Sequence, residues 1–124
     1  MSQHALILFA HGARDPRWAE PFQRLQEITQ AQLPHTTVAL AFLEFMTPDL
    51  PTLVAQLVAS GCNAVTVVPI FFGQGGHVLR DLPAMVAQLQ TQYPGVSFKV
   101  VSAVGESDAV LNVIAQYCVA SVGS

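Results

Sequence analysis

Strand-length apolar segments alternate along the chain with longer segments whose apolar residues recur at helical spacing. The strand-length segments lie at residues 5–10, 37–43, 64–72 and 96–103, and the continuous apolar run at 5–10 is typical of a strand buried on both faces. Helical spacing follows at residues 18–33, 51–60 and 109–119, and residues 80–83 lead into a further helix that ends at Gln92. The pattern therefore predicts four successive strand–helix units.

Strict alternation of strands and helices with short connections predicts an α/β fold. We expect a three-layer arrangement, a four-stranded parallel sheet with helices on both faces, formed by residues 1–124 as a single domain. Segment 64–72 is the most apolar and is placed centrally. In such sheets ligands bind beyond the carboxyl ends of the strands, so the residues that follow each strand are the first candidates for chemistry.

Three of these loops contain a residue that can bind a metal or move a proton. His11 follows the first strand, Glu44 follows the second, and His77 lies in the glycine-rich loop after the third, whereas His4 and His35 fall at the opposite edge. Each alone is an ordinary polar loop residue. Together, two imidazoles and a carboxylate suit a divalent transition metal, and they also suit proton abstraction near neutral pH.

The same edge holds three of the five basic residues, Arg14, Arg17 and Arg80. Because guanidinium groups match carboxylate geometry, this placement suggests an anionic ligand. Local ion pairs, Arg14 with Asp15 and Arg80 with Asp81, are an equally open interpretation. The glycines of residues 73–77 lack the Lys-Ser/Thr of a phosphate-binding loop and favour the close approach of a bulky ligand instead.

Charge is sparse in this chain, and its scarcity excludes several classes of protein. Charged residues make up 10% of the chain, apolar residues 52%, and the net charge is −3. High apolar content excludes disorder, and five basic against eight acidic residues argue against nucleic-acid binding. No segment approaches the ~20 apolar residues of a membrane span, and the first residues lack a basic signal region, so we expect a cytoplasmic protein.

Three motifs carry a resemblance to a known family. The segments HGARDP at 11–16, AFLE at 41–44 and PIFFGQGGHVLRDLP at 69–83 resemble the short CbiX-type chelatases, relatives of sirohydrochlorin cobalto-, nickel- and ferrochelatases. The resemblance extends over roughly residues 5–119. It implies an ATP-independent enzyme that inserts a divalent metal, cobalt favoured, into a tetrapyrrole for cobalamin or sirohaem-type biosynthesis.

The resemblance also implies roles for individual residues. His11 and His77 match the histidines that hold the metal and accept pyrrole protons, and Glu44 matches an acidic position of related chelatases. Arg14 and Arg80 would bind substrate carboxylates, and Phe45, Gly75 and Gly76 would contact the macrocycle. The metal (Co²⁺, Ni²⁺ or Fe²⁺) and the tetrapyrrole are substrates, and no permanently bound cofactor is expected. Short members pair as homodimers to complete a cleft that larger relatives form from two domains.

Two other functions use the same residues. A metal or tetrapyrrole carrier on the same scaffold would bind both ligands without turnover. A phosphoryl-transfer enzyme using His11 is less favoured, because no second Arg–His motif of that type is present.

Overall fold

The computed structural model describes residues 3–73 and 77–123, and within the second range the side chains from residue 81 onward. Four parallel strands form one sheet in the order β2-β1-β3-β4. They span His4–Ala10 (β1), Thr36–Phe42 (β2), Ala64–Pro69 (β3) and Ser97–Val100 (β4). The predicted α/β class and four-stranded parallel sheet are confirmed, and β3 is an interior strand as its apolar sequence predicts.

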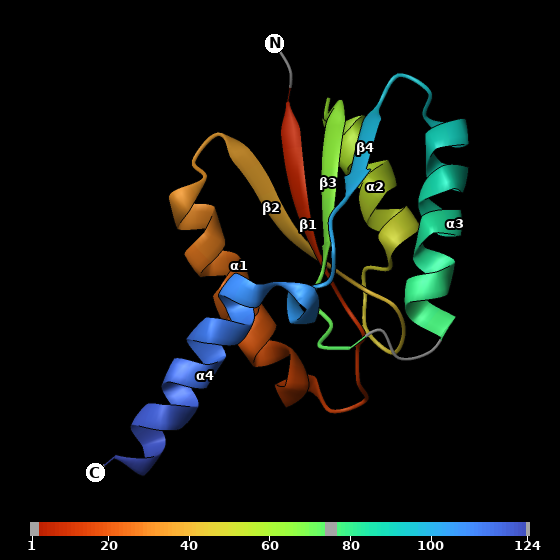
Figure 1. The fold of residues 1–124 in the computed structure, drawn as a ribbon. Helices are drawn as coiled ribbons and strands as arrows, with labels where there is room; N and C mark the ends of the chain where they lie inside the picture. The colour runs from red at the N-terminus through yellow and green to blue at the C-terminus, as the bar shows by residue number, and fades with distance from the viewer. Residues whose placement is uncertain (1–2, 74–76, 124) are drawn as a thin grey trace.

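Helices lie on both faces of this sheet (Figure 1). The α-helices span Glu20–Gln32 (α1), Leu50–Ala59 (α2), His77–Gln92 (α3) and Asp108–Val122 (α4), and the 3₁₀ turns span Pro16–Ala19 (η1) and Val104–Glu106 (η2). Helix α1 packs on one face of the sheet, and α2 and α3 pack on the other. Helix α4 leaves the carboxyl edge of the sheet and runs away from the other elements (Figure 1).

Alternate residues of the strands form two separate cores, one on each face. Toward α2 and α3, β1 contributes Ala5, Ile7 and Phe9, all fully buried. Toward α1 it contributes Leu8 and Ala10, which pack with residues of β2 and α1. Burial on both faces accounts for the unbroken apolar sequence of β1, and it anchors the strand whose end presents His11.

Several predicted boundaries differ from the observed ones, among them those of β3, β4 and α3. Strand β3 ends at Pro69 rather than at residue 72, because its partner β1 ends at Ala10. Strand β4 covers only Ser97–Val100, the length over which β3 pairs with it. Helix α3 already begins at His77, so Pro83 lies inside it. That proline removes one helical hydrogen bond, and the neighbouring Leu82, fully buried in the core, holds this turn against the sheet.

The first turn of α2 is held by a side-chain cap that can be tested. The carboxylate of Asp49 accepts a hydrogen bond from the backbone N–H of Thr52 at 2.9 Å. Hydrogen bonds from the side chain and then the backbone of Thr52 lower the pKa of Asp49. Asp49→Ala should reduce the free energy of unfolding by about 1 kcal/mol at pH 7, because one helical N–H loses its partner. Urea unfolding measures this change.

Acid should remove the charged part of that capping interaction. Because the pKa of Asp49 is lower in the folded than in the unfolded state, its stabilising effect is present above the unfolded pKa and declines as pH falls through the folded one. Asp49→Asn keeps a capping side chain and should show a weaker acid dependence than the parent protein. Equal stability of the alanine variant and the parent at pH 7 would contradict the capping role.

Within residues 3–73 and 77–123, no helix is both long enough and apolar enough to cross a membrane.

Candidate functional site

His11 and Glu44 meet at the carboxyl edge of the sheet. β1 and β2 are parallel neighbours, and their pairing continues past the strand ends through hydrogen bonds from Leu43 N to Ala10 O (2.9 Å) and from Glu44 N to His11 O (3.0 Å). The side chains then lie in contact, with Nε2 of His11 2.8 Å from Oε1 of Glu44. Both side chains are a little under half exposed, so a ligand can reach them.

The direction of this hydrogen bond determines which nitrogen of His11 is available. An ionised carboxylate only accepts hydrogen bonds, so the proton lies on Nε2 when Glu44 is charged. A neutral imidazole then keeps its lone pair on Nδ1. That nitrogen can bind a metal ion or accept a proton, and the contact with Glu44 fixes the orientation of the ring.

Gly12 makes this approach of the two loops possible. Its φ is +96°, and a Cβ at this position would overlap the backbone carbonyl oxygen of Glu44. Only glycine therefore fits between His11 and the loop after β2. Gly12 was not among the site residues predicted from the sequence. Its place directly after His11, at the end of an apolar strand, could have indicated its role.

Phe71 supports the His11 ring from the side of the core. Its ring meets the imidazole edge to face, with centroids 6.3 Å apart, and meets Phe9 in the same way at 5.8 Å. Phe71 is half-buried and packs against the core on the α2–α3 face. Phe72 is 65% exposed. Its backbone carbonyl leaves no room for a Cβ on Gly105, a second glycine near the site that was not predicted from the sequence.

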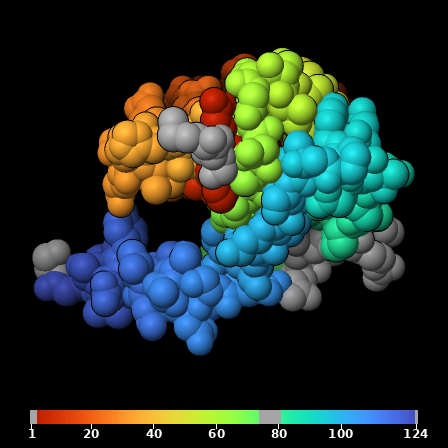
Figure 2. Space-filling model, turned by 90° about the horizontal axis from the view of Figure 1, so that it is seen from above, coloured from red at the N-terminus to blue at the C-terminus, as the bar shows by residue number. Residues whose placement is uncertain are grey.

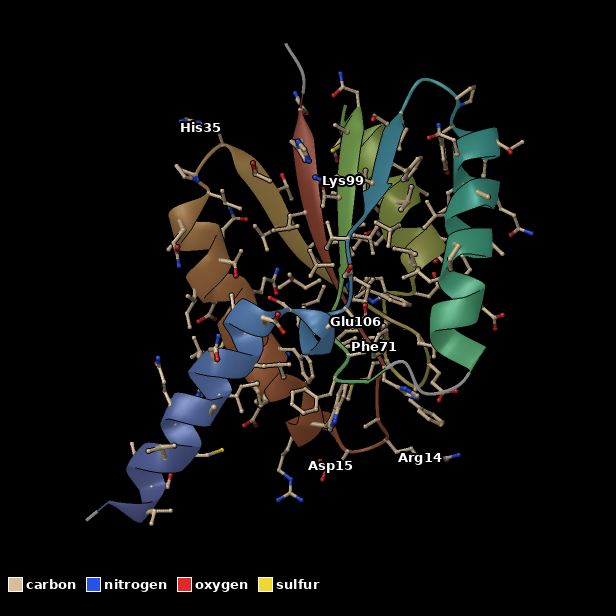
Figure 3. All side chains as sticks on the ribbon, in the orientation of Figure 1. Arg14, Asp15, His35, Phe71, Lys99 and Glu106 are labelled. Carbon is tan, nitrogen blue, oxygen red and sulfur yellow. The ribbon has the colours of Figure 1, made fainter. Side chains whose placement is uncertain are left out.

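Arg14 and Phe45 form a second pair beside His11 and Glu44. The guanidinium carbon of Arg14 lies 4.7 Å from the centroid of the Phe45 ring, a cation–π contact. The expected alternative, an ion pair between Arg14 and Asp15, is wrong, because Asp15 instead pairs with Arg17 at 2.9 Å. The hydrogen bonds from Arg17 lower the pKa of Asp15. Figure 3 shows Arg14 and Asp15 at the same end of the molecule, far from His35.

Phe45 is held in an unusual backbone conformation for a bulky residue. Its φ is +67°, and its side chain is 56% exposed, so burial of the ring does not explain the conformation. Strain of this kind often occurs at ligand-binding positions. A pocket of 550 Å³ opens beside it, lined by residues of the loop and α2 that include Glu44, Phe45, Met46 and Asp49.

The strain at Phe45 gives a measurable prediction. Glycine adopts positive φ without the side-chain penalty of about 1–2 kcal/mol, whereas alanine retains that penalty. Phe45→Gly should therefore be more stable than Phe45→Ala by about 1 kcal/mol in urea unfolding, the reverse of the usual order of these two residues. An alanine variant as stable as the glycine variant would show that the backbone is not strained.

The remaining predicted site residues follow β3. His77 begins α3 and Arg80 lies in its first turn, which places both backbones after β3, but their side chains lie outside the described part of the structure. Gly75 and Gly76 also lie outside the described residues. Among the described residues, no group of three or more His, Cys, Asp or Glu side chains is placed to hold a metal ion. Of the three predicted catalytic residues, His11 and Glu44 are therefore the two whose side chains the structure describes.

Comparison with known proteins gives one family and a consistent set of relatives. The chain matches the CbiX family over residues 5–119. It is 29% identical to the sirohydrochlorin cobaltochelatase of Saccharolobus islandicus (strain L.S.2.15 / Lassen #1) over 102 residues, which cover 79% of this chain and 78% of that protein. It is 27% identical to the sirohydrochlorin cobaltochelatase of Methanococcus aeolicus over 88 residues, 71% of this chain but only 62% of that one.

Solved structures share the same fold. A CbiX protein from Marinobacter aquaeolei VT8 superposes with a TM-score of 0.84 at 32% identity, over 96% of this chain and 97% of that chain. The sirohydrochlorin chelatase SirB from Bacillus subtilis subspecies spizizenii, in complex with cobalt, gives a TM-score of 0.78. That match covers 92% of this chain and 49% of the SirB chain, and at 21% identity it shows a common fold alone.

Proposed function

The chain belongs to the CbiX family, and we propose that it is a sirohydrochlorin chelatase that inserts a divalent metal, with cobalt favoured, without nucleotide hydrolysis. Two observations support this proposal. Relatives matched over most of the chain include proteins named sirohydrochlorin cobaltochelatase. The carboxyl edge of the sheet carries a histidine–carboxylate pair suited to a transition metal and to proton transfer.

The reaction requires that protons leave as the metal enters. Four nitrogen–metal bonds form while two pyrrole N–H bonds break, so two protons must be accepted on the enzyme or by water. In the contact between His11 and Glu44, Nδ1 of His11 keeps a free lone pair. We propose that this nitrogen first holds the incoming metal and then accepts a proton. Glu44 offsets the charge that His11 acquires, and His77 is proposed as the second metal-holding and proton-accepting residue.

Substrate binding is proposed for the residues around this pair. Sirohydrochlorin carries carboxylates, which suit the guanidinium groups of Arg14 and Arg80. The exposed ring of Phe45 offers an apolar surface for the macrocycle, and the cation–π contact presents Arg14 at the edge of that ring. Gly75 and Gly76 would allow the macrocycle to approach the backbone closely.

We further propose that the protein acts as a homodimer, with the substrate between two copies. The match to half of the SirB chain supports this arrangement, because a second copy would supply an equivalent second unit. Symmetric pairing is also the commonest form of homo-oligomer. Cobalt, nickel and iron remain the candidate metals, and competition among the three ions in one assay ranks them.

The observation that carries the proposal is the contact between His11 and Glu44 at the carboxyl edge. The test is the absorbance change of sirohydrochlorin with Co²⁺, compared with and without protein at substoichiometric concentration. We expect faster insertion and more than one product molecule per chain. Stoichiometric binding of metal and pigment with no rate increase over buffer would select the carrier function instead.

A further inference from the structure

The chain exposes two of its seven phenylalanines, and both lie at the carboxyl edge of the sheet. Phe45 is 56% exposed in the loop after β2, and Phe72 is 65% exposed in the loop after β3. The remaining phenylalanines are buried or half-buried. A large apolar ring left in water does not contribute its burial free energy to folding. Two such rings at one edge of the sheet therefore indicate a surface that a ligand covers.

The order of the strands places these two rings on opposite sides of His11. Strand β1 lies between β2 and β3. Figure 2, which looks along the strands, shows the red residues of β1 between the orange and the green parts of the chain. The loop that carries His11 is therefore flanked by the loop of Phe45 and the loop of Phe72. Because β2 and β3 are two strand spacings apart, roughly 10 Å, a flat ligand centred on His11 would meet an apolar ring on each side.

The backbone of Phe72 is held by elements on two sides. The N–H of Ile70 donates a hydrogen bond to the carbonyl of Phe9 in β1 at 2.8 Å, and the N–H of Gly105 in η2 donates to the carbonyl of Phe71 at 3.0 Å. A Cβ on Gly105 would overlap the backbone carbonyl of Phe72, so only glycine fits at this position. The exposed ring of Phe72 therefore extends from a backbone that its neighbours fix.

The backbone beside Phe45 is held in the same way. Gly12 packs against the carbonyl oxygen of Glu44, the residue before Phe45, as Gly105 packs against the carbonyl of Phe72. In both loops a glycine from a neighbouring loop approaches the backbone too closely for any side chain. A ring presented from a fixed backbone loses less conformational entropy when a ligand binds. Both phenylalanines therefore have the support expected of binding residues.

Phe71 and Phe72 are adjacent but have different surroundings. The half-buried ring of Phe71 meets the imidazole of His11 edge to face, with centroids 6.3 Å apart, and packs against the core. Phe72 follows in the chain and is exposed. Since consecutive Cα atoms are about 3.8 Å apart, Phe72 starts from a backbone position next to the residue that supports His11. Its ring is thus placed to contact a ligand at His11 without holding the imidazole itself.

We propose that Phe72 is a substrate-binding residue whose ring contacts the apolar surface of the macrocycle, on the side of His11 opposite to Phe45. This inference rests on the proposed function, because it takes a flat tetrapyrrole as the ligand. Aromatic side chains bind planar π systems by offset stacking or edge-to-face contact, which suits such a ligand. Phe72 has no group that binds a metal or moves a proton, so it acts on substrate binding and not on metal insertion itself.

Binding of metal-free sirohydrochlorin, followed by its absorbance, measures the contribution of the ring without the insertion step. Phe72→Ala should raise the Kd about 10-fold, because the macrocycle loses one aromatic contact. Phe72→Tyr keeps the ring and should remain within about 2-fold of the parent. Ile28→Ala, at an apolar position of α1 that is 52% exposed, is the matched control and should leave the Kd unchanged.

Steady-state rates of cobalt insertion separate binding from chemistry. Phe72→Ala should raise KM about 10-fold and leave kcat within about 2-fold of the parent, because the ring contacts the substrate alone. A merely structural role would instead lower kcat in proportion to the folded fraction and leave KM unchanged.

Gly105→Ala tests whether the position of the Phe72 ring matters. This variant retains the ring but forces η2 away from the Phe72 carbonyl, so the Kd for sirohydrochlorin should again rise about 10-fold. Gly95→Ala, which has open space around its Cβ, is the control. Binding is compared at equal concentrations of folded protein, determined by circular dichroism. If Gly105→Ala does not fold, the two variants of the exposed Phe72 side chain decide the assignment.

These outcomes separate the role of Phe72 from the proposed function. If the parent binds and metallates sirohydrochlorin while Phe72→Ala keeps the parent's Kd and KM, the role of Phe72 is overturned and the proposed function stands. If the parent binds the pigment without metallating it, the proposed function fails, and the Kd values still decide the role of Phe72. A parent that does not bind the pigment overturns both. Sedimentation should show the same association state for Phe72→Ala and the parent, and a change that accounts for the weaker binding would assign the ring to a contact between copies instead.

Discussion

Replacing His11 by alanine should lower the initial rate of cobalt insertion by at least about 100-fold, the lower range for loss of a positioned proton-transfer group. The variant removes the nitrogen that is free to hold metal, and it leaves Glu44 without its 2.8 Å partner. Both side chains are about half exposed, so folding should change little. Initial rates from the absorbance of the metallated pigment, at saturating substrate, measure the effect.

The control is the histidine of a loop at the other edge of the sheet. His35→Ala removes an exposed imidazole far from the candidate site (Figure 3), so its rate should stay within about 2-fold of the parent. Equal losses in the two variants would point to a general effect of histidine on metal delivery. An unchanged rate in His11→Ala would remove the site assignment.

Replacing Gly12 by alanine should cost roughly 3 kcal/mol of unfolding free energy, from positive-φ strain and from overlap with the backbone. Gly12 has a φ of +96°, and its neighbour is the carbonyl of Glu44, which cannot rotate away as a side-chain tip would. The same change should push the His11 and Glu44 loops apart, so that activity falls even where the protein remains folded. Urea unfolding and the insertion rate measure the two effects.

Gly95→Ala is the matched control for this variant. Nothing lies near a Cβ at Gly95, and no positive φ is found there, so alanine should be tolerated within about 0.5 kcal/mol. If Gly12→Ala were as stable as Gly95→Ala, the close approach of the two loops would not exist in solution.

Periodicity and loop order predicted the parts of the molecule that depend on local sequence. The apolar segments predicted that His11 and Glu44 each follow a strand of a parallel sheet. In the structure these two strands are neighbours, and their register brings the two residues together at one edge. The partners of charged loop residues did not follow from adjacency. Asp15 has arginines on both sides, and the turn at η1 directs Arg17 rather than Arg14 toward it.

The backbone conformation of Phe45 and the surroundings of α4 could not be predicted from the sequence, and each has a physical reason. The positive φ of Phe45 comes from the path of a whole loop, and phenylalanine itself does not favour it. The helical spacing of α4 was predicted, but its apolar residues alone did not show whether the chain's own sheet would bury them. The low charge content left open whether a partner covers part of the surface, and the structure shows exposed apolar side chains along α4.

A double-mutant cycle tests most directly whether His11 and Glu44 act as one unit in metal insertion. Rates of cobalt insertion are compared for the parent, His11→Ala, Glu44→Gln and the double variant. If the pair acts as a unit, the double variant should be slower than His11→Ala by less than about 3-fold, because Glu44 works through the imidazole. If the two losses multiply, or if neither single variant is slower than the parent, the pair is not the working centre of the reaction.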